Sequence, residues 1–299
     1  MTSYLEANAR SRIRRLLDPN TFHEFLPPSE RVISPHLGQL DAPVSFDDGI
    51  VIGSGLLQGH RVFAAAQEGG FMGGAVGEVH GAKLVGLFKR AIAEKVEAVI
   101  LLAESGGVRL HEANAGLIAV SEVMRALLET RSAGIPVIAL IGGANGCFGG
   151  MGIVARCANV VVMSEEGRLA MSGPEVIETA AGVEEFDSRD RALVWRTTGG
   201  KHRYLLGDCQ VIVPDSTEAF RNAAIDAMRS VHAEGAALTL DGLQAESAML
   251  ERRLADFGTR IDPVEIWCDL GIPAASTLPM LDADAFRAVA DIHRIGRQP

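Results

Sequence analysis

Cysteine is scarce and scattered in this sequence, and this excludes the sites that depend on clustered thiols. The four cysteines are Cys147, Cys157, Cys209 and Cys268, and no two of them form a CxxC pair. Structural zinc sites and disulfide frameworks both require closely spaced or paired cysteines. We therefore expect neither a metal site nor a disulfide scaffold.

Long apolar runs and excess positive charge are also missing. The opening residues, MTSYLEANARSRIRR, contain no apolar core of a signal peptide. No apolar run reaches the roughly 18 residues that a membrane span needs. The formal net charge of −10 argues against a nucleic-acid groove or an anionic membrane as partner. We expect a cytoplasmic protein that binds neither nucleic acid nor membrane.

Glycine, in contrast, is abundant. The 299 residues include 33 glycines, more than the usual share of about 7%. The densest stretch, IGGANGCFGGMG (141–152), contains six of them and directly follows the apolar run IPVIAL. Glycine costs about 0.5–1 kcal/mol relative to alanine inside regular structure. Such a density therefore indicates that the backbone comes close to another group.

The order of apolar and amphipathic stretches predicts an α/β fold. Two strands joined near Gln58-Gly59 precede a helical stripe from Val79 to Ile92. Alternation of buried strands and helices then predicts a largely parallel sheet. The expected later strands are 98–104, 135–141, 158–163 and 209–213, with a helix over 117–128 and mostly helical structure after them. We divide the chain into an N-terminal segment (1–45, with a short basic helix over 5–17), a main domain (46–230) and a C-terminal helical extension (231–299).

Two glycine turns follow neighbouring strands of this predicted sheet: SGGVR (105–109) and CFGGMG (147–152). Each turn leads into a helix, so its N–H groups lack helical partners and feel the positive end of the helix dipole. One N–H from each turn could stabilise negative charge on a single oxygen, which would be an oxyanion hole. The alternative is that the glycines only permit tight turns or close helix packing.

A phosphate-binding loop is disfavoured. The pattern GxxxxGK[ST] is absent, and GSGLLQG (53–59) matches GxGxxG only loosely, inside a predicted hairpin.

Residues 77–117 and 134–182 resemble the carboxyltransferase branch of the crotonase superfamily, and most closely the β subunits of malonate decarboxylases. Three motifs support this resemblance: SGGVRLHE (105–112), the glycine run (141–152) and GPEVIETA (173–180). The resemblance implies a crotonase-like spiral of ββα units with a helical C-terminal extension. It also implies a malonyl thioester substrate on an acyl-carrier subunit with a phosphoribosyl-dephospho-CoA arm (or CoA). The products are acetyl thioester and CO₂, and a homologous γ subunit would complete the site.

If each motif has the same role here as in the family it resembles, the N–H donors of the oxyanion hole lie in the two glycine turns. The catalytic candidates are Gly106, Gly107, Val108, Gly149 and Gly150, and the donors are Gly107 or Val108 together with Gly149 or Gly150. The substrate-binding candidates are Arg109, Ser172, Gly173, Pro174, Lys201 and Arg203.

Several of these candidates have a structural alternative. In one interpretation, Arg109 binds the substrate phosphate or shapes the oxyanion hole. In the other, it forms an ion pair with Glu112. The turn at 172–174 shapes the acyl pocket, or only packs around a fixed proline. Lys201 and Arg203 either attract a phosphorylated arm or an acidic carrier, or lie in a plain solvated loop (197–207).

The remaining reactive side chains are weaker candidates. His80 and His111 are possible proton donors to an enolate, although a lone histidine is more often solvated or hydrogen-bonded. Cys147 lies close to the expected hole, but no mechanism of the family needs a thiol nucleophile.

The sequence differs from two other groups of the superfamily, and each difference disfavours one activity. Enoyl-CoA hydratases of the same superfamily have a catalytic glutamate where this chain has Gly152, which disfavours hydration. Acetyl-CoA carboxylase β subunits usually begin with a four-cysteine zinc ribbon, and residues 1–146 contain no cysteine. A biotin-dependent carboxyltransferase subunit and a non-catalytic acyl-thioester-binding subunit remain the alternatives.

Overall fold

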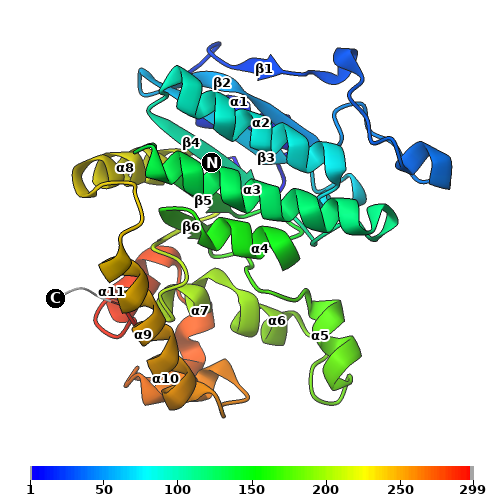
Figure 1. Ribbon diagram of the computed structural model, residues 1–299. Helices are drawn as coiled ribbons and strands as arrows, with labels where there is room; N and C mark the ends of the chain where they lie inside the picture. Colours follow the sequence, from blue (N-terminus) through cyan, green and yellow to red (C-terminus); the bar gives the residue numbers. More distant parts are fainter. Residues whose placement is uncertain (1, 297–299) are drawn as a thin grey trace.

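Seven strands form one sheet in which their order in space is the same as their order along the chain (Figure 1). The computed structural model describes residues 2–296. β1, β2 and β3 pair antiparallel, and β3 to β7 pair parallel. The strands are β1 His23–Phe25, β2 Ile50–Leu57, β3 His60–Gln67, β4 Ala98–Ala103, β5 Val137–Ile141, β6 Val160–Ser164 and β7 Val211–Val213. The predicted hairpin and parallel sheet are both present.

Helices cover both faces of the sheet because every parallel strand is apolar on both sides. In β4, Val99, Leu101 and Ala103 join the buried cluster under three of the helices. The alternate residues Ala98, Ile100 and Leu102 join the cluster on the other face. The first face carries α2 Glu78–Glu94, α3 Asn114–Ser132 and α4 Gly149–Arg156, and the second carries α1 Ala9–Leu16 and α8 Thr217–Glu234 (Figure 1).

A second, much smaller β layer crosses the carboxyl ends of the strands. Val76 forms a parallel bridge with Val108, Ser105 with Cys147, and Cys147 with Leu169. After β4, β5 and β6 the chain therefore passes a second β position before its next helix. This is the expected spiral of ββα units, with the second strand of each unit reduced to one or two residues.

The remaining helices gather beyond the β6–β7 edge of the sheet (Figure 1). They are α5 Pro174–Ala181, α6 Arg191–Thr198, α7 Gly200–Leu205, α9 Leu240–Phe257, α10 Pro263–Asp269 and α11 Ala283–Ala290. The predicted solvated loop at 197–207 is wrong, because α6 ends and α7 forms there. Within residues 2–296, no helix combines the length and apolar character needed to cross a membrane.

The N-terminal segment is part of this architecture. The predicted basic helix is present as α1, and it packs on the sheet through Ile13 and Leu16. Asn8 accepts a hydrogen bond from the Ser11 amide and caps the start of α1. The short strand β1 had no sequence signal, and it extends the sheet beside β2.

Candidate functional site

The two glycine turns meet at the carboxyl ends of β4 and β5. A Cβ atom on Gly149 would lie 2.9 Å from the Cα of Gly107. Two backbone hydrogen bonds join the turns: the Ser105 amide donates to the Gly146 carbonyl (2.8 Å), and the Phe148 amide donates to the Ser105 carbonyl (2.7 Å). The parallel arrangement of the strands thus brings together two segments that lie about 40 residues apart in the sequence.

Three of the candidate amides are occupied by acceptors within the chain. The Gly106 amide donates to the Gly73 carbonyl (2.8 Å), and the Gly149 amide donates to the Met171 carbonyl (2.9 Å). The Gly107 amide donates to the Ser105 hydroxyl (3.2 Å). These three residues shape the turns, and their N–H groups are not free to bind a substrate oxygen.

Val108 and Gly150 carry the N–H groups that remain. Neither amide has an acceptor among residues 2–296, and both residues are half-buried. Gly150 lies in the first turn of α4, where the amides of Gly150 and Met151 have no helical partner and the helix dipole is positive. This pair of amides, one from each turn, can stabilise negative charge that develops on an oxygen between them.

Most of the other glycines in the 141–152 stretch accommodate neighbours within the chain. A Cβ on Gly142 would approach the Phe220 ring to 2.7 Å, and one on Gly143 would approach the Glu104 carboxyl carbon to 2.4 Å. A Cβ on Gly150 would lie 2.7 Å from a Val120 methyl group. The glycine density therefore has two causes: the free amide of α4, and close packing around it.

Arg109 lies in a buried ion-pair network, which favours the structural interpretation over binding of substrate phosphate. Its side chain is fully buried and forms ion pairs with Asp48 (2.9 Å) and Glu112 (3.2 Å). Its remaining donors bind the carbonyls of Ala75 and Asp48. The expected pair with Glu112 is present, within a larger buried network that fixes the end of the 105–109 turn.

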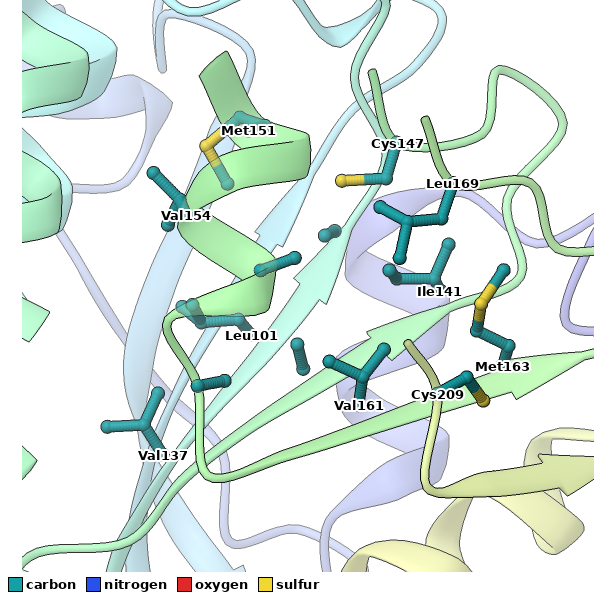
Figure 2. Close-up of a cluster of buried hydrophobic side chains, with 14 of the residues drawn as sticks. Leu101, Val137, Ile141, Cys147, Met151, Val154, Val161, Met163, Leu169 and Cys209 are labelled. Carbon is teal, nitrogen blue, oxygen red and sulfur yellow. The ribbon is translucent and has the colours of Figure 1, made fainter. Parts of the chain in front are cut away.

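His80 and Cys147 lie in the protein interior. Burial, and next the nearby Arg109 charge, lower the pKa of His80 to about 3, so its imidazole is uncharged at neutral pH and is a poor proton donor. Burial raises the pKa of the Cys147 thiol to about 12, which makes it a poor nucleophile. Figure 2 shows Cys147 among the buried side chains under α4, near Ile141 and Leu169. His111, by contrast, is exposed directly after the first glycine turn.

Ser172, Gly173 and Pro174 lie beside the second glycine turn. The preceding residue, Met171, accepts the hydrogen bond from the Gly149 amide, and Pro174 begins α5 after the N-cap Gly173. These residues are therefore close enough to border a substrate that reaches the two free amides.

Lys201 and Arg203 do not lie in an exposed loop. The Lys201 ammonium donates to the carbonyls of Pro279 (2.9 Å) and Leu281 and pairs with Glu165 (3.3 Å). Arg203 pairs with Asp208 (3.2 Å). Lys201 thus attaches the C-terminal segment to the main domain, and Arg203 is paired within the main domain; a role of either side chain in binding the carrier arm or the carrier stays a prediction.

Glu104 and Arg12 are neighbours of the site that the sequence analysis missed. Glu104 directly precedes the first glycine turn and forms a buried ion pair with Arg12 of α1. The available signal was a charged residue at the end of the apolar run AVILLA, with no partner in the local sequence. Partners 92 residues apart cannot be paired from local pattern.

Exposed apolar side chains lie on the segments that frame the two turns. Leu110 is 90% exposed directly after the first turn, and Leu117 and Ile118 of α3 are 56% and 62% exposed. Met171 is exposed next to the second turn. Such a concentration of exposed apolar residues around a site is typical of a surface that another subunit covers.

No group of three or more His, Cys, Asp or Glu side chains within residues 2–296 is arranged to hold a metal ion. The hydrogen-bond donors that the described site leaves without acceptors on the two turns include the amides of Val108 and Gly150.

Comparison with known proteins gives consistent matches. The family model of the carboxyl transferase domain matches residues 6–224. The malonyl-S-ACP:biotin-protein carboxyltransferase of Malonomonas rubra is 40% identical, over 96% of this chain and 95% of that protein. An acetyl-coenzyme A carboxylase carboxyl transferase subunit beta of Fusobacterium nucleatum is 30% identical, over 58% of this chain and 59% of that protein. A chain of the Pseudomonas malonate decarboxylase hetero-tetramer, solved with malonate, superposes with a TM-score of 0.80 at 39% identity, covering 88% of this chain and 95% of that one.

Proposed function

Because the chain belongs to the carboxyl transferase family, we propose that it removes the carboxyl group of a malonyl thioester, as the β subunit of a malonate decarboxylase. The observation that carries this proposal is the pair of free amides of Val108 and Gly150 on two turns in contact. The similarity to the Malonomonas and Pseudomonas proteins supports malonyl thioester as the substrate.

The reaction places negative charge where these amides can bind it. Cleavage of the bond between the α-carbon and the carboxylate releases CO₂ and leaves its electron pair on the α-carbon. Conjugation moves that charge to the thioester oxygen, giving an enolate. The amides of Val108 and Gly150 bind this oxygen more strongly as its charge grows, and this lowers the barrier. A proton from an acid or from water then gives the acetyl thioester.

Rigid placement of the donors is what the protein contributes. Loss of one donor from an oxyanion hole typically costs about 10²–10³ in rate. The bonds of the Gly106, Gly107 and Gly149 amides hold both turns in place before substrate arrives. Neither a covalent nucleophile nor a side-chain base is needed for the bond cleavage itself.

The exposed apolar residues around the turns suggest that a second subunit completes the site. We propose that a homologous γ subunit covers Leu110, Leu117 and Ile118. A Pseudomonas malonate decarboxylase hetero-dimer resembles this chain with a TM-score of 0.66 at 36% identity. The thioester would arrive on the phosphoribosyl-dephospho-CoA arm of an acyl-carrier subunit, or on CoA, and its acyl end would pass the turn at 172–174.

A second candidate is transfer of the carboxyl group to a biotin-bearing protein. It is favoured by one observation, the 40% identity to the malonyl-S-ACP:biotin-protein carboxyltransferase of Malonomonas rubra. The cleavage of malonyl thioester and the role of the two amides are the same in both candidates. They differ in whether the carboxyl group leaves as free CO₂ or is captured by biotin.

The test is CO₂ release from malonyl thioester on a carrier protein. It is measured with this chain alone and after co-expression with a candidate γ subunit, first without biotin and then with a biotinylated protein. Release that requires the γ subunit but no biotin supports the decarboxylase. Loss of malonyl thioester only with the biotinylated protein, with the carboxyl group recovered on biotin and not as CO₂, supports carboxyl transfer. An intact thioester in every mixture rejects both candidates.

A further inference from the structure

We propose that Glu104 is a positioning residue that holds the two amide donors at their working separation. This inference rests on the proposed function, because it concerns the same pair of amides. Glu104 lies between the last residue of β4 and Ser105, and it is 4% exposed. Its backbone therefore belongs to the segment that carries Val108.

The side chain of Glu104 binds the other segment. Its Oε1 atom accepts hydrogen bonds from the Asn145 backbone amide (3.0 Å) and from the Asn145 Nδ2 atom (3.1 Å). Asn145 lies in the loop between β5 and α4, four residues before Gly149. One carboxylate thus connects the turn that presents Val108 to the loop that leads to Gly150.

The second carboxylate oxygen is held from the N-terminal segment. The Arg12 Nη1 atom donates to Oε2 of Glu104, and Arg12 is itself buried. The other Arg12 donors bind the carbonyls of Tyr4 (2.9 Å) and Leu5 (3.1 Å). Because every polar atom of this pair has a partner, neither side chain can rotate without leaving a buried charge unsatisfied.

Glycines pack closely around Glu104. A Cβ on Gly69 would lie 2.4 Å from Glu104 Oε1, and one on Gly143 would lie 2.4 Å from its carboxyl carbon. A Cβ on Gly74 would collide with the Glu104 carbonyl oxygen at 1.9 Å. Three glycines therefore enclose Glu104, and one of them belongs to the glycine-rich stretch that follows β5.

Without Glu104, we expect the two amide donors of the oxyanion hole to be displaced but still present. The two backbone hydrogen bonds of Ser105 would still join the turns, but Asn145 would be released. A displacement of about 1 Å at a catalytic group can cost about a hundredfold in rate. We therefore expect a fall in kcat of about tenfold to a hundredfold for Glu104→Ala, with little change in KM. Glu104→Gln keeps an acceptor for Asn145, so its loss of kcat should be smaller.

The experiment compares wild type, Glu104→Ala, Glu104→Gln and a control, Asp18→Asn, each co-expressed with the γ subunit. Asp18 is a matched acidic residue that pairs with Arg221 and binds the amides of the β2–β3 turn, at the opposite end of the strands. We would measure kcat and KM for malonyl thioester on its carrier, with thermal melting to establish the folded fraction. Amide hydrogen exchange of residues 142–152 would be measured on the same samples.

Supporting results are a graded fall in kcat of folded complexes (Ala below Gln, Gln below wild type) and faster exchange over 142–152. Asp18→Asn should change neither. Wild-type kcat in folded Glu104→Ala, or a raised KM with kcat unchanged, would overturn the inference. If Glu104→Ala does not fold, the same two criteria apply to Glu104→Gln. If the wild-type complex leaves the thioester intact, the proposed function fails, and unchanged exchange over 142–152 in folded Glu104→Ala would separately overturn the positioning role.

Discussion

Gly149 and Gly107 touch through backbone atoms: a Cβ on Gly149 would lie 2.9 Å from the Gly107 Cα. Gly149 also has a φ of +59°, a left-handed conformation that L side chains rarely adopt. The contact joins the two turns that carry the amides of Val108 and Gly150. It also means that a methyl group at this point would separate the two turns.

We expect Gly149→Ala to lower kcat of the folded complex by about tenfold or more, because the new methyl group pushes the turns apart. The left-handed conformation adds about 1–2 kcal/mol of strain. The measurement is kcat for malonyl thioester, together with the free energy of unfolding.

Gly134→Ala is the matched control for the strain alone. Gly134 has a φ of +81°, and a Cβ there would meet no atom within 4 Å. It lies between α3 and β5, at the other end of the strand. We expect a similar loss of stability with unchanged kcat. Equal loss of activity in the two variants would mean that the contact between the turns has no special role.

The sequence was sufficient to predict the parallel sheet and the meeting of the two turns. Both follow from local signals, namely apolar runs of strand length and glycines at their carboxyl ends. The choice between Gly149 and Gly150 as donor did not follow, because it depends on the Met171 carbonyl, which binds the Gly149 amide. Hydrogen bonds between segments of the spiral decide which amides remain free, and no local pattern encodes them.

Charged residues were the least predictable part of the site. Lys201 and Arg203 suggested a solvated loop, yet Lys201 binds the Pro279 carbonyl and Arg203 pairs with Asp208. Arg109 and Glu104 are buried because their partners, Asp48 and Arg12, come from distant segments. Whether a charge is solvated or paired depends on tertiary contacts, so composition and spacing leave the question open.

We expect Arg109→Met to destabilise the chain by about 3–5 kcal/mol, because it leaves the buried carboxylates of Asp48 and Glu112 without their shared cation. Arg125→Met is the control, since Arg125 pairs with Glu122 on the exposed surface of α3; its loss should cost less than about 1 kcal/mol. Urea unfolding of the two variants makes the comparison. Wild-type stability of Arg109→Met combined with a raised KM would instead restore the substrate-binding role.

We expect Leu110→Asp to prevent assembly with the γ subunit while the chain itself stays folded. Leu110 is 90% exposed beside the first glycine turn, and a buried charge at the centre of an interface is strongly unfavourable. Ile261→Asp is the control, because Ile261 is 93% exposed but lies between α9 and α10. Size-exclusion chromatography of co-expressed subunits decides: a complex that survives Leu110→Asp would place the interface elsewhere.

The buried histidines should make the chain less stable in mild acid. Burial, and next the charge of Arg109, lower the pKa of His80 to about 3. Burial, and next Arg203, likewise lower the pKa of His202 to about 3. Between pH 3 and 6.5 the unfolded chain binds a proton at each of these residues and the folded chain does not. The free energy of unfolding therefore falls as pH falls through this window.

Each histidine should contribute a loss of about 2 kcal/mol between pH 7.5 and pH 5. We expect His80→Gln to remove one such contribution: whatever its stability at pH 7.5, it should lose about 2 kcal/mol less than wild type on acidification to pH 5. His202 remains in this variant, so part of the dependence should persist. Urea unfolding at both pH values measures the difference. If His80→Gln loses as much stability as wild type, His80 is protonated in the folded chain, and the pKa shift attributed to its burial is wrong.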